Sequence, residues 1–138
     1  YAYKNGVETV LNPAPANKPT DILLQNTSWF IPNEIEFEEI YGDIFNENNL
    51  LLFAKNVDTN VVVTLGEKGC AYIENNSVKI IKADSVKAID TTGAGDAFVG
   101  AFSFALASKL DIEECLKLAL KKATDSVTKK GTQSSYKN

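Results

Sequence analysis

Short apolar runs recur along the chain and predict its strands. The clearest is Asn60–Leu65 (NVVVTL), which is uninterrupted and rich in β-branched residues, as the buried strands of parallel sheets are. The pair Asn75-Asn76 separates two further runs and predicts a hairpin, because asparagine tolerates the positive φ of a tight turn. The predicted strands are Val7–Leu11, Ser28–Ile31, Asn60–Leu65, Cys70–Glu74, Val78–Lys82 and Val86–Ile89.

Longer stretches with helical spacing lie between these runs. In Asn33–Tyr41, apolar side chains recur at helical intervals, and Gly42 stands where a helix commonly ends. Ala97–Ser108 is almost wholly apolar and predicts a buried helix, whereas Ile112–Lys129 is amphipathic and is followed by Gly131, which would end it. The remaining predicted helices are Asp21–Leu24, Leu50–Asn56 and a helix end at Tyr1–Gly6.

This alternation of strands and helices predicts an α/β protein, a three-layer α/β/α sandwich around a mostly parallel sheet. Ligands of such folds bind at the carboxyl ends of the strands. Polar or glycine-rich turns follow three predicted strands, at Asn33, Thr64–Gly69 and Asp90–Asp96. We expect these turns to converge at one edge of the sheet and to form a site there.

Composition narrows the class of protein. The length of 138 residues corresponds to about one domain, and the net charge of −4 argues against a nucleic-acid partner. No apolar run is long enough to span a membrane. Cys70 and Cys115 lie far apart without a CxxC pattern, which favours free thiols in a reducing compartment and therefore a cytoplasmic protein. The chain has no methionine, so we expect it to be a fragment of a longer protein.

The most informative motif is DTTGAGDAFVGAF at Asp90–Phe102. Its turn, Gly93–Gly95, precedes a predicted helix, so backbone N–H groups would face a phosphate at the positive end of the helix dipole. Asp96 follows directly and fits a general base in a chain without histidine. The alternative from the residues alone is that Asp96 caps the helix and the glycines form a turn. A Walker-type loop is absent, and Phe98 stands where a Rossmann motif needs glycine.

The same motif resembles the C-terminal signature of the PfkB carbohydrate kinase family. Four other segments are similar to this family in the same order along the chain, so the resemblance covers essentially residues 1–138. These segments are LNPAPA at Leu11–Ala16, PNEIEFEE at Pro32–Glu39, VTLGEKG at Val63–Gly69 and VTKKGTQSS at Val127–Ser135. The resemblance implies the ribokinase-like fold and favours the members that phosphorylate ribose over fructose and adenosine kinases.

The resemblance implies a phosphoryl-transfer site. Asp96 would deprotonate the primary hydroxyl of the sugar, and Gly93, Ala94 and Gly95 would form the anion hole for the transferred phosphoryl group. Asp90, with Asp96, would also lie at the sugar substrate. The residues that would bind ATP are Asn33, Thr64, Leu65, Gly66, Glu67, Lys68, Gly69 and Gly95.

Two cations are implied as well. Asn33 and Glu36 match an NxxE element that would position Mg²⁺ through water and the phosphates. An Asn-x-x-Glu pattern is also a capping box, and both interpretations can hold together.

Asp90 would bind a monovalent cation, K⁺, although from the residues alone it could equally cap a strand end. The other implied K⁺ ligands are the carbonyls of Thr92, Ser126, Lys129 and Gly131, with Ser135.

The chain also departs from the family. Ala119 stands near the position where an asparagine usually contacts the nucleotide, and alanine cannot make that contact. The sugar-binding part and its lid, which are N-terminal in the family, are not in this sequence. We therefore expect residues 1–138 to be the C-terminal, ATP-binding part of an enzyme that is homodimeric at full length. Alone it should be inactive; the alternatives are another family kinase or a non-catalytic nucleotide-binding module.

Overall fold

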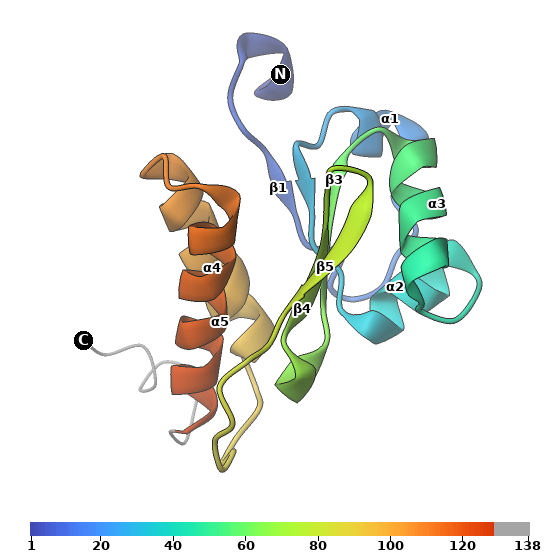
Figure 1. Ribbon diagram of the computed structural model, residues 1–138. Coiled ribbons are helices and arrows are strands. Elements are labelled where there is room, and N and C mark those ends of the chain that lie inside the picture. Colours follow the sequence, from blue (N-terminus) through green and yellow to red (C-terminus); the bar gives the residue numbers. More distant parts are fainter. Residues whose placement is uncertain (129–138) are drawn as a thin grey trace. The chain divides into compact units, whose positions relative to one another are not determined.

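The computed structural model describes residues 1–128 and divides the chain into two compact units (Figure 1). The first unit comprises Tyr1–Leu65 and Ala71–Ile80. The second comprises Gly66–Cys70 and, of the described residues, 81–128.

A five-stranded sheet has the strand order β1-β2-β3-β4-β5. The first two pairings are parallel, with Val10 beside Trp29 and Phe30 beside Val61. Two left-handed asparagines, Asn75 with φ 51° and Asn76 with φ 58°, connect β4 to β5, so this pair is the predicted antiparallel hairpin. The sheet is therefore mixed. Its strands are β1 (Val10–Leu11), β2 (Trp29–Phe30), β3 (Asn60–Thr64), β4 (Cys70–Glu74) and β5 (Ser77–Ile81).

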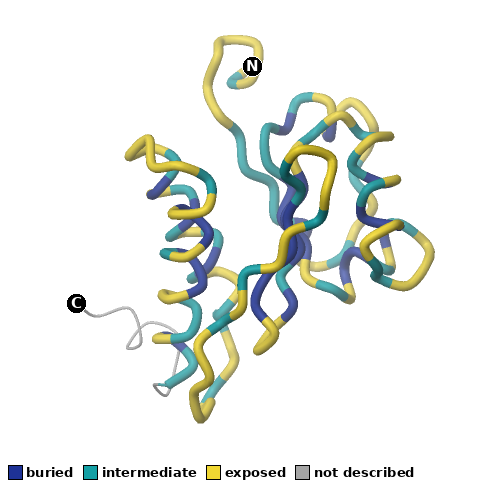
Figure 2. Tube along the Cα trace, in the orientation of Figure 1, coloured by how far each residue is buried: buried dark blue, intermediate teal, exposed yellow. Residues whose placement is uncertain are grey.

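Three helices belong to the first unit: α1 (Asp21–Gln25), α2 (Glu34–Tyr41) and α3 (Glu47–Val57). Their apolar side chains share one buried cluster with Phe30, Val61 and Val63 of the sheet. Figure 2 colours the buried residues of the chain dark blue. Phe37 of α2 lies at the middle of an aromatic group, 5.4 Å from the ring centroid of Phe53 and 5.5 Å from that of Tyr41. Ring packing of this kind fixes α2 against α3.

The second unit contains a helical hairpin of α4 (Ala94–Ala107) and α5 (Ile112–Val127). Phe98 and Phe102 lie buried on one face of α4, with stacked rings 6.4 Å apart. The amphipathic pattern of α5 is confirmed for four of its apolar positions, Cys115, Leu116, Ala119 and Leu120, which are buried, whereas Ile112 is only partly buried. The buried residues of this helix are Cys115, Leu116, Ala119, Leu120 and Ser126.

Two predictions about local structure are wrong. Val86–Ile89 is not a strand: no strand occurs between Lys82 and Ile89, and Ile89 donates its backbone N–H to the carbonyl of Val127 at the end of α5. The helix α4 is not wholly buried either, since Phe104 is 68% exposed. Strands β1 and β2 are also shorter than the apolar runs that predict them.

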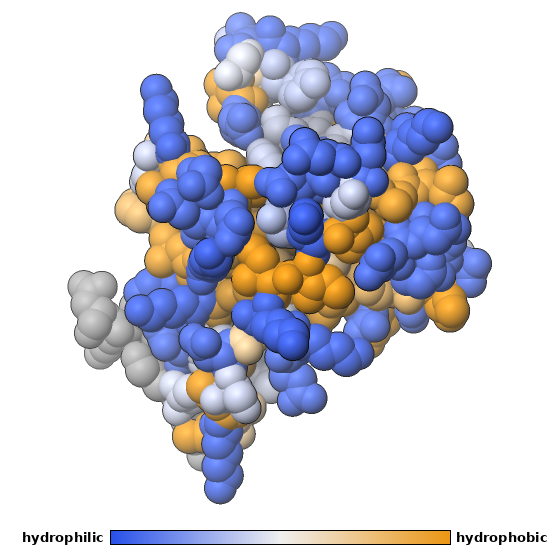
Figure 3. Space-filling model, in the orientation of Figure 1, coloured by the Kyte–Doolittle hydropathy of each residue, from blue (hydrophilic) through white to orange (hydrophobic). Residues whose placement is uncertain are grey.

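Apolar atoms reach the surface at several places on the molecule (Figure 3). They include Ile22, Ile35 and Ile44 in the first unit, each more than half exposed. No helix among the described residues has the length and hydropathy that crossing a membrane requires.

Candidate active site

The carboxyl ends of β2 and β3 lie side by side in the first unit. The backbone N–H of Thr64, the last residue of β3, donates to the carbonyl of Pro32 at 3.0 Å, and Thr64 pairs in a parallel bridge with Asn33, which follows β2. The sequence predicts that the turns after these strands meet, and for Asn33 and Thr64 the structure confirms it. Adjacent parallel strands end at the same edge of a sheet, which places both residues where α/β proteins bind ligands.

Asn33 and Glu36 form a complete capping box at the start of α2. The Asn33 side-chain oxygen accepts from the N–H of Glu36 at 2.8 Å, and Oε2 of Glu36 accepts from the N–H of Asn33 at 2.8 Å. Glu36 is only 8% exposed, and its Oε1 makes no hydrogen bond to any described residue. A fixed carboxylate oxygen beside a carboxamide is a donor set that suits the hard cation Mg²⁺, directly or through water. The capping role of Asn33 and Glu36 is thus confirmed. Oε1 of Glu36 takes no part in the capping box, and its chemistry suits a cation ligand.

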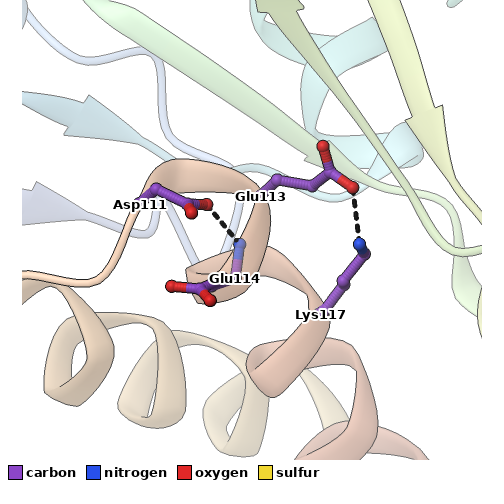
Figure 4. Close-up of polar contacts among 4 residues, drawn as sticks. All are labelled: Asp111, Glu113, Glu114 and Lys117. Carbon is purple, nitrogen blue, oxygen red and sulfur yellow. Dashed lines mark hydrogen bonds and ion pairs between the residues drawn. The ribbon is translucent and has the colours of Figure 1, made fainter.

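The N-terminus of α4 differs from that of every other α-helix in the described residues. A side-chain oxygen caps the other four, and Figure 4 shows one of them, in which Asp111 accepts from the N–H of Glu114. At α4 the cap residue is Gly93 in the left-handed conformation, φ 81°, and no side chain caps the helix. The first helical bond is donated by Ala97, so the N–H groups of Gly95 and Asp96 have no partner among residues 1–128.

Such a helix start can bind an anion, because unpaired N–H groups and the helix dipole both favour negative charge. Asp96 lies in this first turn, is exposed, and makes no hydrogen bond to the described residues. Its carboxylate is therefore open to a reactant. The sequence correctly predicts the turn, the helix and the place of Asp96 within it.

Asp90 forms hydrogen bonds within the loop that leads into α4 and with the end of α5. Its Oδ1 accepts from the N–H of Thr92 at 2.9 Å, and its own N–H donates to the carbonyl of Val127 at 3.2 Å. Ser126, a predicted K⁺ ligand, precedes Val127, is buried, and donates its hydroxyl to the carbonyl of Ala123. The structure thus brings Asp90 and Thr92 together next to the end of α5. The predicted ligands Lys129, Gly131 and Ser135 lie outside the described residues.

The segment Gly66–Gly69 forms a short turn in the second unit. Gly66–Lys68 is a 3₁₀ turn, and the N–H of Gly69 donates to the carbonyl of Gly66 at 3.1 Å. Gly69 has φ 107°, and a Cβ atom built there would lie 1.9 Å from the carbonyl oxygen of Ile81. Gly69 therefore has a packing role that the sequence analysis missed, because only the fold shows which backbone passes beside it.

Neither cysteine has the properties of a nucleophile. Burial raises the pKa of the Cys70 thiol to about 12, and a weaker hydrogen bond from the backbone of Ile81 opposes this shift. Burial also raises the pKa of Cys115, assisted by the negative charges of Asp111 and Glu114. Both thiols stay protonated near neutral pH, as the sequence predicts for structural cysteines. The described residues contain no cluster of three or more His, Cys, Asp or Glu side chains that could hold a metal directly.

Comparison with curated proteins finds sugar kinases along the whole chain. The chain is 42% identical to a ribokinase of Haemophilus influenzae over 140 residues and 39% identical to a deoxyribokinase of Salmonella typhi over 142 residues. These matches cover 97% and 99% of this chain but 45% and 46% of the two relatives. The chain thus spans less than half the length of the curated relatives that it matches.

Solved structures agree on the fold. A ribokinase from Thermotoga maritima superposes with a TM-score of 0.86 at 33% identity, covering 97% of this chain and 47% of the other. An Arabidopsis thaliana ribokinase solved with ribose and ATP superposes with a TM-score of 0.85 at 27% identity, covering 96% of this chain and 45% of the other. The predicted fold class, a ribokinase-like α/β sandwich, is therefore confirmed.

The family match extends further than any single motif. The model of the pfkB family of carbohydrate kinases matches residues 1–138, from the first residue of the chain to the last. The match includes Asp90–Phe102, the motif on which the sequence analysis relies most. The chain belongs to the PfkB family of carbohydrate kinases.

Proposed function

We propose that this chain is the C-terminal, ATP-binding part of an enzyme that phosphorylates D-ribose with ATP and forms D-ribose 5-phosphate. The observation that carries the proposal is the start of α4, where two N–H groups without a partner among residues 1–128 and the exposed carboxylate of Asp96 lie within one turn. In a family of carbohydrate kinases, an anion site next to a general base has an immediate use in phosphoryl transfer.

The reaction assigns one task to each of these groups. Asp96 accepts the proton of the C5 hydroxyl as its oxygen forms a bond to the γ-phosphorus of ATP. The bond between that phosphorus and the β,γ-bridging oxygen breaks, and ADP leaves with its electron pair. The N–H groups of Gly95 and Asp96 donate hydrogen bonds to the γ-phosphoryl oxygens, whose charge they stabilise. Ala94, which the resemblance places in the anion hole with Gly93 and Gly95, already donates its N–H to the carbonyl of Thr91 at 3.3 Å.

The remaining predicted residues support the nucleotide. Thr64 and the segment Leu65–Gly69 would line the phosphates and ribose of ATP. Asn33 and Glu36 would hold Mg²⁺, which neutralises charge on the phosphates when it is bound. Asp90 would bind K⁺ beside the anion hole. The expected homodimer and the cytoplasmic location stay predictions.

A second candidate substrate is 2-deoxyribose. The deoxyribokinase of Salmonella typhi is 39% identical to this chain, close to the value for the Haemophilus influenzae ribokinase. Both sugars have the C5 primary hydroxyl that Asp96 would deprotonate and differ only at C2. The part of the protein that would contact C2 is, on this proposal, N-terminal to residue 1.

The test is a substrate screen with the full-length protein that contains this chain. ATP-dependent phosphorylation should be fastest with ribose, compared with 2-deoxyribose, fructose and adenosine. A preference for 2-deoxyribose would select the second candidate, and a preference for fructose or adenosine would overturn both. Absence of any ATP-dependent activity would favour a non-catalytic nucleotide-binding module instead.

The role of Asp96 has a position-matched control. Asp96→Asn should lower kcat by roughly 10²–10⁴-fold, the usual effect of removing a general base. Glu114 occupies the same place in the first turn of α5 and is also exposed (Figure 4). Glu114→Gln removes an equivalent charge from a helix start and should leave kcat unchanged. Equal effects of the two substitutions would contradict a catalytic role for Asp96.

A further inference from the structure

The parallel ladder between β1 and β2 lacks one backbone donor at its carboxyl end. The N–H of Trp29 donates to the carbonyl of Thr9 at 2.9 Å, and that of Ile31 donates to the carbonyl of Leu11 at 2.8 Å. Within β1, every second residue directs its N–H toward β2. In the register that pairs Val10 with Trp29 and Leu11 with Phe30, these are residues 11 and 13, and the N–H of residue 13 would face the carbonyl of Ile31. Residue 13 is proline and has no N–H.

The side chain of Asn12 supplies the missing bond. Its Nδ2 donates to the carbonyl of Ile31 at 2.7 Å. Ile31 is fully buried, at 0% exposure, so its carbonyl would otherwise be an unpaired acceptor in the interior. Asn12 and Pro13 thus act together: the proline ends the strand and the asparagine satisfies the acceptor that this leaves.

The bond lies directly before the candidate magnesium element. Ile31 and Pro32 are the two residues that precede Asn33, and each of their carbonyls accepts a hydrogen bond from a neighbouring segment of the chain. Asn12 donates to Ile31 from the β1 side, and the N–H of Thr64 donates to Pro32 at 3.0 Å from the β3 side. The chain is therefore held from both sides just before it turns into the capping box of Asn33.

We propose that Asn12 is a positioning residue for Asn33 and Glu36, acting through the carbonyl of Ile31. This proposal rests on the proposed function, because it assumes that Asn33 and Glu36 bind Mg²⁺ and ATP. Loss of the Asn12 bond lets the Ile31–Asn33 backbone move and misplaces the Glu36 carboxylate relative to the nucleotide. The effect should therefore fall on the binding of Mg²⁺ and ATP more than on the chemical step that Asp96 serves.

Asn60, the first residue of β3, offers a control at the amino end of β2. Its Nδ2 donates to the carbonyl of Ser28 at 2.9 Å, and its backbone N–H donates to the same carbonyl at 3.3 Å. Asn12→Ala and Asn60→Ala in the full-length protein each remove an asparagine side chain that donates to a carbonyl beside β2, but only the first lies next to Asn33. The Ser28 carbonyl keeps its backbone donor in Asn60→Ala, so the two variants are compared by local exchange at Asn33 and Glu36 and not by global stability.

The first measurement is hydrogen exchange without nucleotide. In Asn12→Ala, exchange at the N–H groups of Asn33 and Glu36 should accelerate, whereas in Asn60→Ala it should not. The second is steady-state kinetics: Asn12→Ala should raise KM for Mg²⁺·ATP by roughly 2- to 12-fold, the factor for one lost hydrogen bond, with a smaller change in kcat. Unchanged exchange at Asn33 and Glu36, or the same KM in both variants, would overturn the proposal.

A rescue variant tests the physical cause. Pro13→Ala in the Asn12→Ala background restores a backbone N–H opposite the carbonyl of Ile31, so exchange and KM should return toward their original values. A double variant as defective as Asn12→Ala, or one that stays unfolded if the single variant unfolds, would overturn the proposal. Exchange needs no turnover: if the full-length protein has no kinase activity, the proposed function fails while the exchange result still decides whether Asn12 positions Asn33.

Discussion

The backbone N–H of Asp90 donates a hydrogen bond to the carbonyl of Val127, the last residue of α5, at 3.2 Å. The same carbonyl accepts from Ile89 at 2.7 Å. The last carbonyls of a helix have no partner within it, so this pairing satisfies the end of α5 and also fixes the loop that leads into α4. Asp90 is thereby held next to the end of α5, the region in which the K⁺ ligands are predicted.

This arrangement predicts that activity depends on Asp90 and on K⁺. Sugar phosphorylation by the full-length enzyme should be faster in KCl than in NaCl at equal ionic strength, because a site of oxygen ligands selects its cation by size and charge. Asp90→Ala should abolish the difference between the two salts. Asp84→Ala, an exposed acid in the same segment, should preserve it. Equal rates of the unchanged enzyme in both salts would contradict the cation assignment.

Gly69 should tolerate no side chain. Gly69→Ala places a Cβ atom 1.9 Å from the carbonyl oxygen of Ile81 and 2.8 Å from the nitrogen of Ala83, and both are backbone atoms that cannot rotate away. The strained φ and the overpacking cost roughly 1–3 kcal/mol each, so unfolding free energy should fall by about 2–6 kcal/mol.

The control for Gly69 is Gly100, an exposed position inside α4. A Cβ atom there would meet no atom of the described residues within 4 Å outside its own stretch of helix, and its φ is an ordinary one. Gly100→Ala should therefore stabilise the protein by up to about 1 kcal/mol through helix propensity. Thermal unfolding of the two full-length variants measures both effects. Similar melting temperatures for the two would show that the approach of Gly69 to Ile81 is not tight.

Cys70 should make stability fall at alkaline pH. Burial raises its pKa from the ordinary value of 9.0 to about 12, so the folded state keeps a proton that the unfolded state releases. Between those two pH values the unfolded state binds fewer protons, and the free energy of unfolding decreases as pH rises, by at most about 1.4 kcal/mol per pH unit. Below pH 9 the contribution is fully present.

The variant Cys70→Ala isolates this contribution. All other ionisable groups are common to both proteins, so the difference in slope reports the thiol. Urea unfolding at several pH values should give a shallower alkaline decline for Cys70→Ala than for the unchanged protein. Identical declines would contradict the burial of the thiol as the cause.

Parts of the candidate site could be predicted from the sequence because their signals are local. Asn33 and Glu36 are three residues apart, and the capping box needs only that spacing and a helix. The turn at Gly93 likewise needs only glycine's freedom to adopt φ 81°. Asn12 and Gly69 could not be found in this way. Their roles depend on Ile31 and Ile81, which the fold brings beside them from distant positions in the sequence.

Two elements follow from local sequence alone, because their own residues begin and end them: α2 between Asn33 and Gly42, and the β4–β5 hairpin across Asn75-Asn76. Caps and turns depend on a few neighbouring residues, so local energetics suffices there. The absence of a strand at Val86–Ile89, in contrast, follows from tertiary contacts. An apolar run becomes a strand only where another backbone pairs with it, and here the amide of Ile89 pairs with the end of a helix instead.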